Sequence, residues 1–190
     1  TPAHRDDHIP MTKIAGLVLA AGEGRRFGGP KAPFVYEGER LVDRAVRMCH
    51  EAGCDPVFVV VGAWIDDVPA AKVVVNDSWR EGMGSSLRAG LAAAMSEPDI
   101  DRVLVTLVDL PGMPAQALER VAASESSIAQ GCFAGDRGHP VLLGREHWAA
   151  AMAMAQGDRG ARDYLRAHHE QIACIEIGDV ASGSDLDVRP

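Results

Sequence analysis

The sequence predicts an α/β protein with three α/β/α layers, in which helices cover both faces of a doubly wound, mostly parallel sheet. Short apolar runs at residues 14–20, 56–61 and 102–108 have the length and composition of fully buried strands. Segments of ten or more residues with helical periodicity lie between these runs. Strands that alternate with such helices indicate βαβ units and a parallel sheet.

The expected strands are continuous apolar runs. Residues 14–20 read IAGLVLA and lead directly into a glycine-rich loop. Residues 56–61 (PVFVVV) and 102–108 (RVLVTLV) repeat the pattern, and residues 72–75 give a shorter strand. Because parallel strands are buried on both faces, apolar residues at every position fit a central sheet better than an alternating pattern would.

Helices are expected between these strands, over residues 40–52, 84–95 and 114–123. In the first segment, apolar positions follow one another at i, i+4, i+7, i+8 and i+11, which places them on one face of a helix. These positions are Leu41, Ala45, Met48, Cys49 and Ala52.

The alternation loosens after Ser124. Residues 129–133 and 140–143 flank a glycine-rich, charged stretch and predict a hairpin or an insertion. The remaining expected elements are helices at residues 145–154 and 159–168 and a last strand at 172–177.

The length of 190 residues fits one domain, so we expect a tail at residues 1–12 and a single domain at 13–190. No apolar run approaches the ~20 residues of a membrane span. The first eleven residues lack the hydrophobic centre of a signal peptide. A net charge of −8 argues against nucleic-acid binding. We therefore expect a cytoplasmic protein that binds neither membranes nor nucleic acid.

The four cysteines, Cys49, Cys54, Cys132 and Cys174, form no CxxC pair and show no zinc-finger spacing. We expect reduced thiols, as is usual in the cytosol.

The most informative feature is the loop after the first strand, residues 19–31, which reads LAAGEGRRFGGPK. Four glycines in eight positions let backbone N–H groups come close to an anion. Arg25, Arg26 and Lys31 concentrate positive charge in an otherwise acidic chain. Open α/β sheets bind ligands at the carboxyl ends of their strands, so the loop predicts a triphosphate site.

Other phosphate-binding loops do not fit these residues. A Walker A loop needs GxxxxGK[ST], but Ala32 follows Lys31. In a GxGxxG fingerprint the third glycine would stand where this chain has Phe27, and Pro30 and Pro33 would interrupt the helix that should follow. A glycine-rich turn without a ligand is the remaining alternative, and it leaves the concentrated positive charge unexplained.

Residues 82–87 (GMGSSL) open a predicted helix. Small residues there permit close approach, and free N–H groups and the hydroxyls of Ser85 and Ser86 attract an anion or a base edge. A plain helix cap by either serine is the alternative.

Two acidic motifs could hold Mg²⁺. Asp109 follows a buried strand at the edge where the ligand is expected, although an aspartate before a turn can also cap local backbone groups. Asp185 and Asp187 stand at i and i+2 on an extended segment and so point the same way. For these two, a solvated tail is the alternative.

The loop pattern LAAGxxxRxGxxK resembles the signature of nucleotidyltransferases that share the sugar-nucleotide pyrophosphorylase fold. Over residues 14–187 the chain is most similar to the branch that attaches CMP or GMP to molybdopterin, the cytidylyltransferase side in particular. The resemblance implies a nucleotide-diphospho-sugar transferase-like fold. It also implies Mg²⁺-dependent transfer of NMP from an NTP, CTP first and GTP next, to a phosphorylated acceptor such as the molybdopterin cofactor, with release of pyrophosphate.

The resemblance further implies roles for single residues. Arg25, Lys31 and Asp109 would be catalytic, and Asp109 would bind the metal together with Asp185, which we favour over Asp187. The nucleotide would be bound by Leu19, Ala20, Ala21, Gly22, Gly24, Arg25, Lys31, Gly84, Ser85 and Ser86.

The acceptor pocket is implied by two other family-like segments, a G-x-P at residues 138–140 and GDxGAR at 157–162. Its expected residues are His139, Asp158 and Arg162. Two alternatives stay open: a sugar phosphate as acceptor, or a non-catalytic chaperone that carries a nucleotide-modified cofactor. The expected protein partner is a molybdoenzyme or its chaperone.

Overall fold

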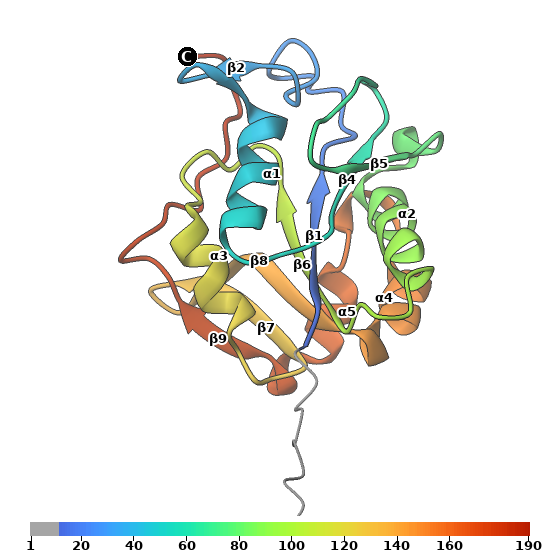
Figure 1. Cartoon of the computed structure of the whole chain (residues 1–190), viewed down its shortest axis with the longest axis vertical. Coiled ribbons are helices and arrows are strands. Elements are labelled where there is room, and N and C mark those ends of the chain that lie inside the picture. The colour runs from blue at the N-terminus through green and yellow to red at the C-terminus, as the bar shows by residue number, and fades with distance from the viewer. Residues whose placement is uncertain (1–11) are drawn as a thin grey trace, which may run out of the picture.

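The computed structural model describes residues 12–190 and contains a seven-stranded sheet with helices on both faces (Figure 1). All but the last residue of the predicted tail at 1–12 lies outside the described residues. The strands lie in the order β5-β4-β1-β6-β8-β7-β9. Their bounds are β1 Ile14–Leu19, β4 Val57–Val61, β5 Lys72–Val75, β6 Arg102–Leu107, β7 Ile128–Phe133, β8 Asp136–Gly144 and β9 Ala173–Glu176.

The sheet is mostly parallel, as predicted. β1 pairs in parallel with β4 and β6, β4 with β5, and β7 with β9. β8 runs antiparallel to both β6 and β7. The hairpin predicted after Ser124 is therefore β7–β8, and it belongs to the central sheet rather than to an insertion.

Two layers of helices cover the sheet. α1 (Leu41–Glu51) and α3 (Ala115–Ala122) lie on one face, and α2 (Met83–Met95), α4 (Trp148–Met154) and α5 (Arg162–Ala167) on the other (Figure 1). Both predicted C-terminal helices begin later than expected, each after a 3₁₀ turn. No helix within residues 12–190 is long and apolar enough to cross a bilayer. The short elements are β2 Val35–Tyr36, β3 Glu39–Arg40, and the 3₁₀ turns η1 Trp79–Glu81, η2 Arg145–His147, η3 Gly157–Arg159 and η4 His169–Gln171.

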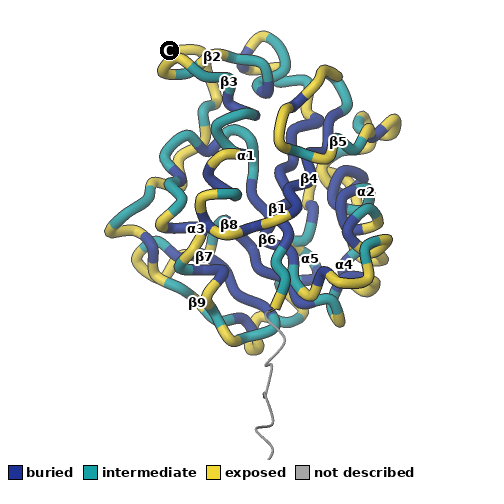
Figure 2. The backbone as a smooth tube through the Cα atoms, viewed as in Figure 1, coloured by how far each residue is buried: buried dark blue, intermediate teal, exposed yellow. Residues whose placement is uncertain are grey.

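The central strand β1 is buried on both faces (Figure 2). Val18 packs in the apolar cluster under α1 and α3, whereas Leu17 and Leu19 pack in the cluster under α2, α4 and α5. This explains why the sequence of β1 is apolar throughout rather than alternating. The carboxyl end of β1 delivers the glycine-rich loop to one edge of the sheet.

The prediction of four reduced thiols is wrong for two of them. Cys132 of β7 and Cys174 of β9 form a disulfide with Cα atoms 5.7 Å apart. The pairing of these neighbouring strands joins residues 42 positions apart, which sequence spacing does not reveal. Cys49 and Cys54 are free and buried, and burial raises the pKa of Cys54 to about 12. Disulfides are uncommon in cytosolic proteins, so this disulfide does not support the expected cytoplasmic location. That location stays a prediction.

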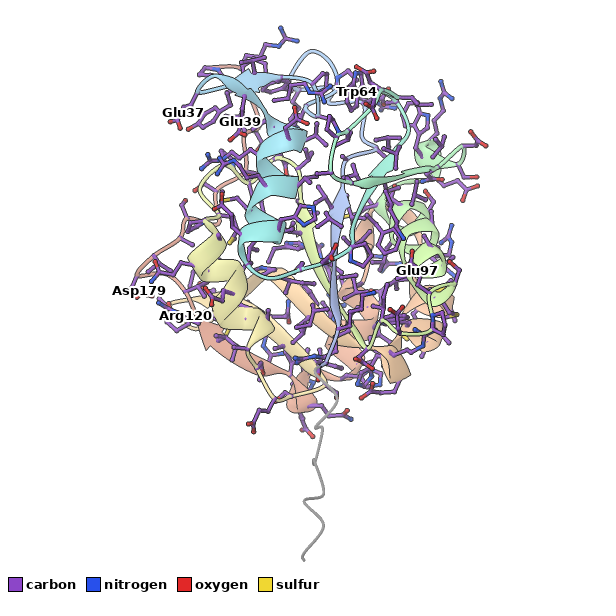
Figure 3. All side chains as sticks on the ribbon, viewed as in Figure 1. Glu37, Glu39, Trp64, Glu97, Arg120 and Asp179 are labelled. Atoms are coloured by element: carbon purple, nitrogen blue, oxygen red, sulfur yellow. A yellow bond between two sulfur atoms is a disulfide. The ribbon has the colours of Figure 1, made fainter. Side chains whose placement is uncertain are left out.

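The C-terminal segment is tied back to the carboxyl edge of the sheet. Arg120 of α3 donates to the carboxylate of Asp179 at 2.7 and 3.2 Å (Figure 3). Beyond this pair, the amides of Ser182 and Leu186 donate to carbonyls in residues 109–112 at 3.0 and 2.9 Å. The last acidic motif is thereby placed beside the loop that follows β6.

Candidate active site

The glycine-rich loop closes into a tight turn after β1. The amides of Gly28 and Gly29 donate to the carbonyl of Gly24 at 2.9 and 3.0 Å. Gly24 has a φ of +63°, and a Cβ there would lie 1.9 Å from the carbonyl oxygen of Gly29, so the turn requires glycine. Phe27, which occupies the third-glycine position of a dinucleotide loop, is buried edge-on against Phe34 with ring centroids 4.9 Å apart.

Gly22 is under no such constraint. A Cβ at Gly22 would meet no atom within 4 Å. The fold therefore does not need glycine here, whereas close approach of a ligand to the backbone would. The nearby side chain of Arg25 is 87% exposed and forms an ion pair with Glu23, so its guanidinium stands at the surface of the loop.

A cleft of about 440 Å³ lies between the glycine-rich loop and the start of α2. Trp79 and Arg80, which the sequence did not single out, line it, and the Arg80 guanidinium lies 4.4 Å from the centroid of the Trp79 ring. Both belong to the one-turn helix η1, which has no periodic signal in the sequence. The other lining residues include Gly22, Arg25, Met83, Ser86 and Asp158.

The two serines at the start of α2 are buried and hydrogen-bonded to the protein. Asn76 donates to the hydroxyls of Ser85 and Ser86 at 2.8 and 3.0 Å, and the Ser85 hydroxyl donates to the carbonyl of Gly82 at 2.8 Å. Neither serine caps α2, whose N-cap is Gly82. Of the two, Ser86 lines the cleft.

Gly84 packs closely against the backbone of residues 155–156. A Cβ at Gly84 would lie 2.7 Å from the backbone nitrogen of Gln156, and one at Gly82 would lie 2.5 Å from a carboxylate oxygen of Asp158. The small residues that the sequence suggested for ligand approach thus admit residues 155–158. This packing places Asp158, a predicted acceptor residue, at the edge of the cleft.

Three charged side chains meet beyond the carboxyl end of β6. The Nζ atom of Lys31 lies 2.8 Å from Oδ2 of Asp109 and 3.6 Å from Oδ1 of Asp187. The side chains of Lys31 and Asp109 are only 15% and 18% exposed, and that of Asp187 is 50% exposed. The second carboxylate that reaches this cluster is therefore Asp187, whereas Asp185, the residue favoured by the sequence, forms no ion pair within residues 12–190.

Leu110, which follows Asp109, is buried in the apolar cluster under α1 and α3. Because it faces the core, leucine at this position contributes to packing. The Asp-Leu-Pro motif at residues 109–111 therefore combines one residue of the site with one of the core.

The donor set of this cluster fits a magnesium ion that binds together with substrate. Within residues 12–190, no group of three or more His, Cys, Asp or Glu side chains could form a complete metal site. Asp109 and Asp187 nevertheless converge on one point, which a cation, the ammonium of Lys31, occupies. Mg²⁺ is commonly held by one or two carboxylates, with phosphate oxygens and water as the other ligands.

A second cleft, of about 540 Å³, lies beyond Leu19 and Met83, which line both clefts. Its floor is apolar and includes Leu87, Val105 and Val141. It is also lined by all three predicted acceptor residues and by four cationic or ionisable side chains that the sequence did not single out. His139 is half-buried, whereas the exposed residues that form the rim are Asp158, Arg162, Arg137, Arg159, Arg166 and His169.

Helical spacing could have revealed one of the missed residues, since Arg166 follows Arg162 by one turn of α5. Burial lowers the pKa of His139, and the charge of Arg162 acts in the same direction while Asp109 opposes it. The lowered pKa favours the neutral imidazole, so the arginines provide the positive charge of this cleft.

Similar proteins were found by sequence and by structure. Residues 16–172 match the model of the MobA-like NTP transferase domain. The chain is 36% identical to nicotine blue oxidoreductase of Paenarthrobacter nicotinovorans, over 96% of this chain and 95% of the relative. It is 31% identical to a molybdenum cofactor guanylyltransferase of Rhizobium leguminosarum, over 84% of this chain and 78% of the relative.

Among solved structures, Rv0371c of Mycobacterium tuberculosis has the same fold. The TM-score is 0.77 at 24% identity, over 93% of this chain and 94% of that one. This likeness and the observed strand order confirm the predicted nucleotide-diphospho-sugar transferase-like fold.

Proposed function

Because the chain belongs to the MobA-like NTP transferase family, we propose that it is a Mg²⁺-dependent nucleotidyltransferase that moves NMP from an NTP to a phosphorylated acceptor. The relative named molybdenum cofactor guanylyltransferase supports molybdopterin cofactor as the acceptor. A molybdoenzyme, or a chaperone for one, would then receive the product.

The observation that carries this proposal is the position of the charged cluster relative to the two clefts. Leu19 and Met83 line both large clefts and also a smaller one of about 190 Å³, which Lys31 and Asp109 line as well. An NTP in the first cleft and an acceptor in the second would therefore meet beside Lys31 and Asp109. Holding two reactants side by side replaces an encounter in solution with a reaction in one complex.

The chemistry requires no protein nucleophile. An acceptor phosphate is already ionised at neutral pH, and its oxygen would attack the α-phosphorus in line and expel pyrophosphate. Lys31 and Arg25 would neutralise the charge that develops on the leaving group. A divalent cation held by Asp109 and Asp187 would supply a Lewis acid at the α-phosphate. The arginines at the rim of the second cleft would orient the acceptor phosphate.

The proposed donor is CTP, with GTP next. The preference for CTP rests only on the resemblance of the chain, residues 82–87 included, to the cytidylyltransferase branch. The guanylyltransferase relative makes GTP the direct competitor.

Pyrophosphate release with each of the four NTPs and Mg²⁺ tests this function. Molybdopterin and a panel of sugar phosphates serve as acceptors, and reactions without acceptor give the background. Pyrophosphate release that requires molybdopterin supports the proposal. Release with a sugar phosphate but not with molybdopterin would identify a sugar phosphate as the acceptor. NTP binding without any release would favour the chaperone alternative.

The relative from Paenarthrobacter nicotinovorans favours a second candidate, an oxidoreductase, because its similarity extends over almost the whole of both chains. In that case the glycine-rich loop would bind the diphosphate of a reduced nicotinamide dinucleotide. The nicotinamide would pass a hydride to an aromatic compound in the second cleft. The absorbance of the reduced nicotinamide should then fall only when such an aromatic acceptor is present. That result, together with no pyrophosphate formed from any NTP, would establish this function instead.

A further inference from the structure

The ammonium group of Lys31 stands between two carboxylates in the free protein. It lies 2.8 Å from Asp109 and 3.6 Å from Asp187, and within residues 12–190 these two aspartates form no ion pair with any other residue. We propose that Lys31 is a built-in substitute for the divalent cation. It holds the two carboxylates in place while the site is free and leaves them when a metal ion takes its position. The inference rests on the proposed function for the identity of the metal site.

Charge repulsion gives this arrangement its physical basis. Two carboxylates that approach a common point repel each other unless a cation lies between them. Asp109 is 18% exposed, so solvent screens its charge poorly. The pair with Lys31 removes this cost in the free protein and keeps Asp187, on the C-terminal segment, near the loop after β6.

The side chain of Lys31 is free to move although its backbone is held. The Lys31 carbonyl accepts from the amide of Phe34 at 3.0 Å, and the carbonyl of Ala32 accepts from the amide of Val42 at 3.1 Å. The flexible four-carbon stem of a lysine lets its ammonium change partners without a backbone movement. Lys31 lines the same small cleft as Gly22 and Gly24, so the ammonium has open space toward the proposed phosphate site.

One lysine would therefore serve two partners in turn, the carboxylates in the free protein and the triphosphate in the complex. If Lys31 exchanges partners in this way, its removal should affect metal binding and catalysis in opposite directions. Removing the ammonium should strengthen metal binding to the free protein, because the metal ion no longer competes with it, although catalysis should weaken.

The first test measures Mn²⁺ binding to nucleotide-free protein from the electron paramagnetic resonance of unbound Mn²⁺. We expect Lys31→Met to bind Mn²⁺ at least about tenfold more tightly than the original chain. Arg26→Met is the matched control, because Arg26 is an exposed cation of the same loop. Arg26→Met should change the affinity for Mn²⁺ less than twofold. In the double variant Lys31→Met/Asp187→Asn, the gain in Mn²⁺ affinity should disappear. Unchanged or weaker binding by Lys31→Met would overturn the proposal.

The second test follows Lys31 directly by NMR with ¹³Cε-labelled lysine. The chain contains three lysines, and the other two, Lys13 and Lys72, pair with Asp99 and Glu97. As Mg²⁺ is added, the Lys31 resonance should move while these two stay in place. A Lys31 resonance that stays fixed at saturating Mg²⁺ would overturn the exchange. Neither test depends on turnover. A protein without nucleotidyltransferase activity would refute the proposed function, whereas the Mn²⁺ affinities and the Lys31 resonance would still test the exchange.

Discussion

The guanidinium of Arg44 donates two hydrogen bonds to the carbonyl oxygen of Pro111, at 2.9 and 3.2 Å. A carboxylate oxygen of Glu39, in the short strand β3 that precedes α1, lies 3.8 Å from the same guanidinium. Because Pro111 ends the Asp-Leu-Pro motif, this contact fixes the loop that begins with Asp109 to the surface of α1. The carboxylate of the proposed metal site is thus positioned by a helix that contributes no residue to the clefts described above.

We predict that Arg44→Lys lowers kcat by about tenfold, which corresponds to about 1.4 kcal/mol of barrier, with little change in the KM for NTP. A lysine cannot reproduce the two-pronged contact with one carbonyl. Arg47→Lys is the control, because Arg47 lies on the same helix but pairs with Glu39 and Glu51. Steady-state kinetics of both variants measure kcat and the KM for NTP. Equal kcat values for the two variants would remove Arg44 from the positioning of Asp109.

Gly22 and Gly24 should respond differently to alanine. Gly24→Ala forces a side chain into a left-handed backbone conformation and against the Gly29 carbonyl, so we expect a loss of about 2 kcal/mol or more of unfolding free energy. Gly22→Ala should leave the melting temperature of the free protein nearly unchanged and weaken NTP binding at least tenfold, since its methyl group would occupy open space beside the loop. Calorimetry of melting and of binding gives both quantities. Normal NTP affinity in Gly22→Ala would place the phosphates elsewhere.

Gly84→Ser adds a third consecutive serine at the start of α2, and we expect it to destabilise this chain by about 1–3 kcal/mol. The new side chain would collide with the backbone at Gln156. Ala89→Ser, on the half-buried side of the same helix, controls for the propensity of serine. An unchanged melting temperature in Gly84→Ser would show that residues 155–158 give way easily.

The lowered pKa of His139 makes folding stability depend on pH. Below about pH 6.5, the ordinary histidine value, the unfolded chain binds a proton that the folded chain does not, so stability falls as the pH falls toward the lowered pKa. His139→Gln should therefore lose less melting temperature than the original chain between about pH 7.5 and pH 5.5. His169→Gln, at an exposed position that lines the same cleft, serves as control. Equal losses in the original chain and His139→Gln would show that His139 titrates normally.

Most of the fold was predictable because its main strands are buried on both faces. Runs such as residues 56–61 have an apolar residue at every position, and the helices α1, α2 and α3 follow β1, β5 and β6 along the chain. Local sequence did not predict the Cys132–Cys174 disulfide, which depends on the pairing of β7 with β9. It also missed the 3₁₀ turns before α4 and α5, since a single turn has no periodicity.

The candidate site was predictable where one continuous segment forms it. The glycine-rich loop and Lys31 lie within 13 residues, and their chemistry is visible in that stretch alone. The choice between Asp185 and Asp187 depends on how the C-terminal segment docks on residues 109–112, which local sequence does not encode. The sequence is ambiguous at Gly84, because a small residue at a helix start can admit a ligand or, as residues 155–156 do here, another part of the chain.

The most direct test of the central claim is single-turnover pyrophosphate release from CTP with Mg²⁺ and molybdopterin, measured on the original chain and on Asp109→Asn. We expect release by the original chain, faster with CTP than with GTP. Asp109→Asn should show less than a tenth of that rate at saturating Mg²⁺, because loss of a metal ligand should cost more than about 1.4 kcal/mol of barrier. CTP binding in the absence of metal should change little in the variant. Release at a similar rate by both proteins, or no release from any NTP by the original chain, would contradict the central claim.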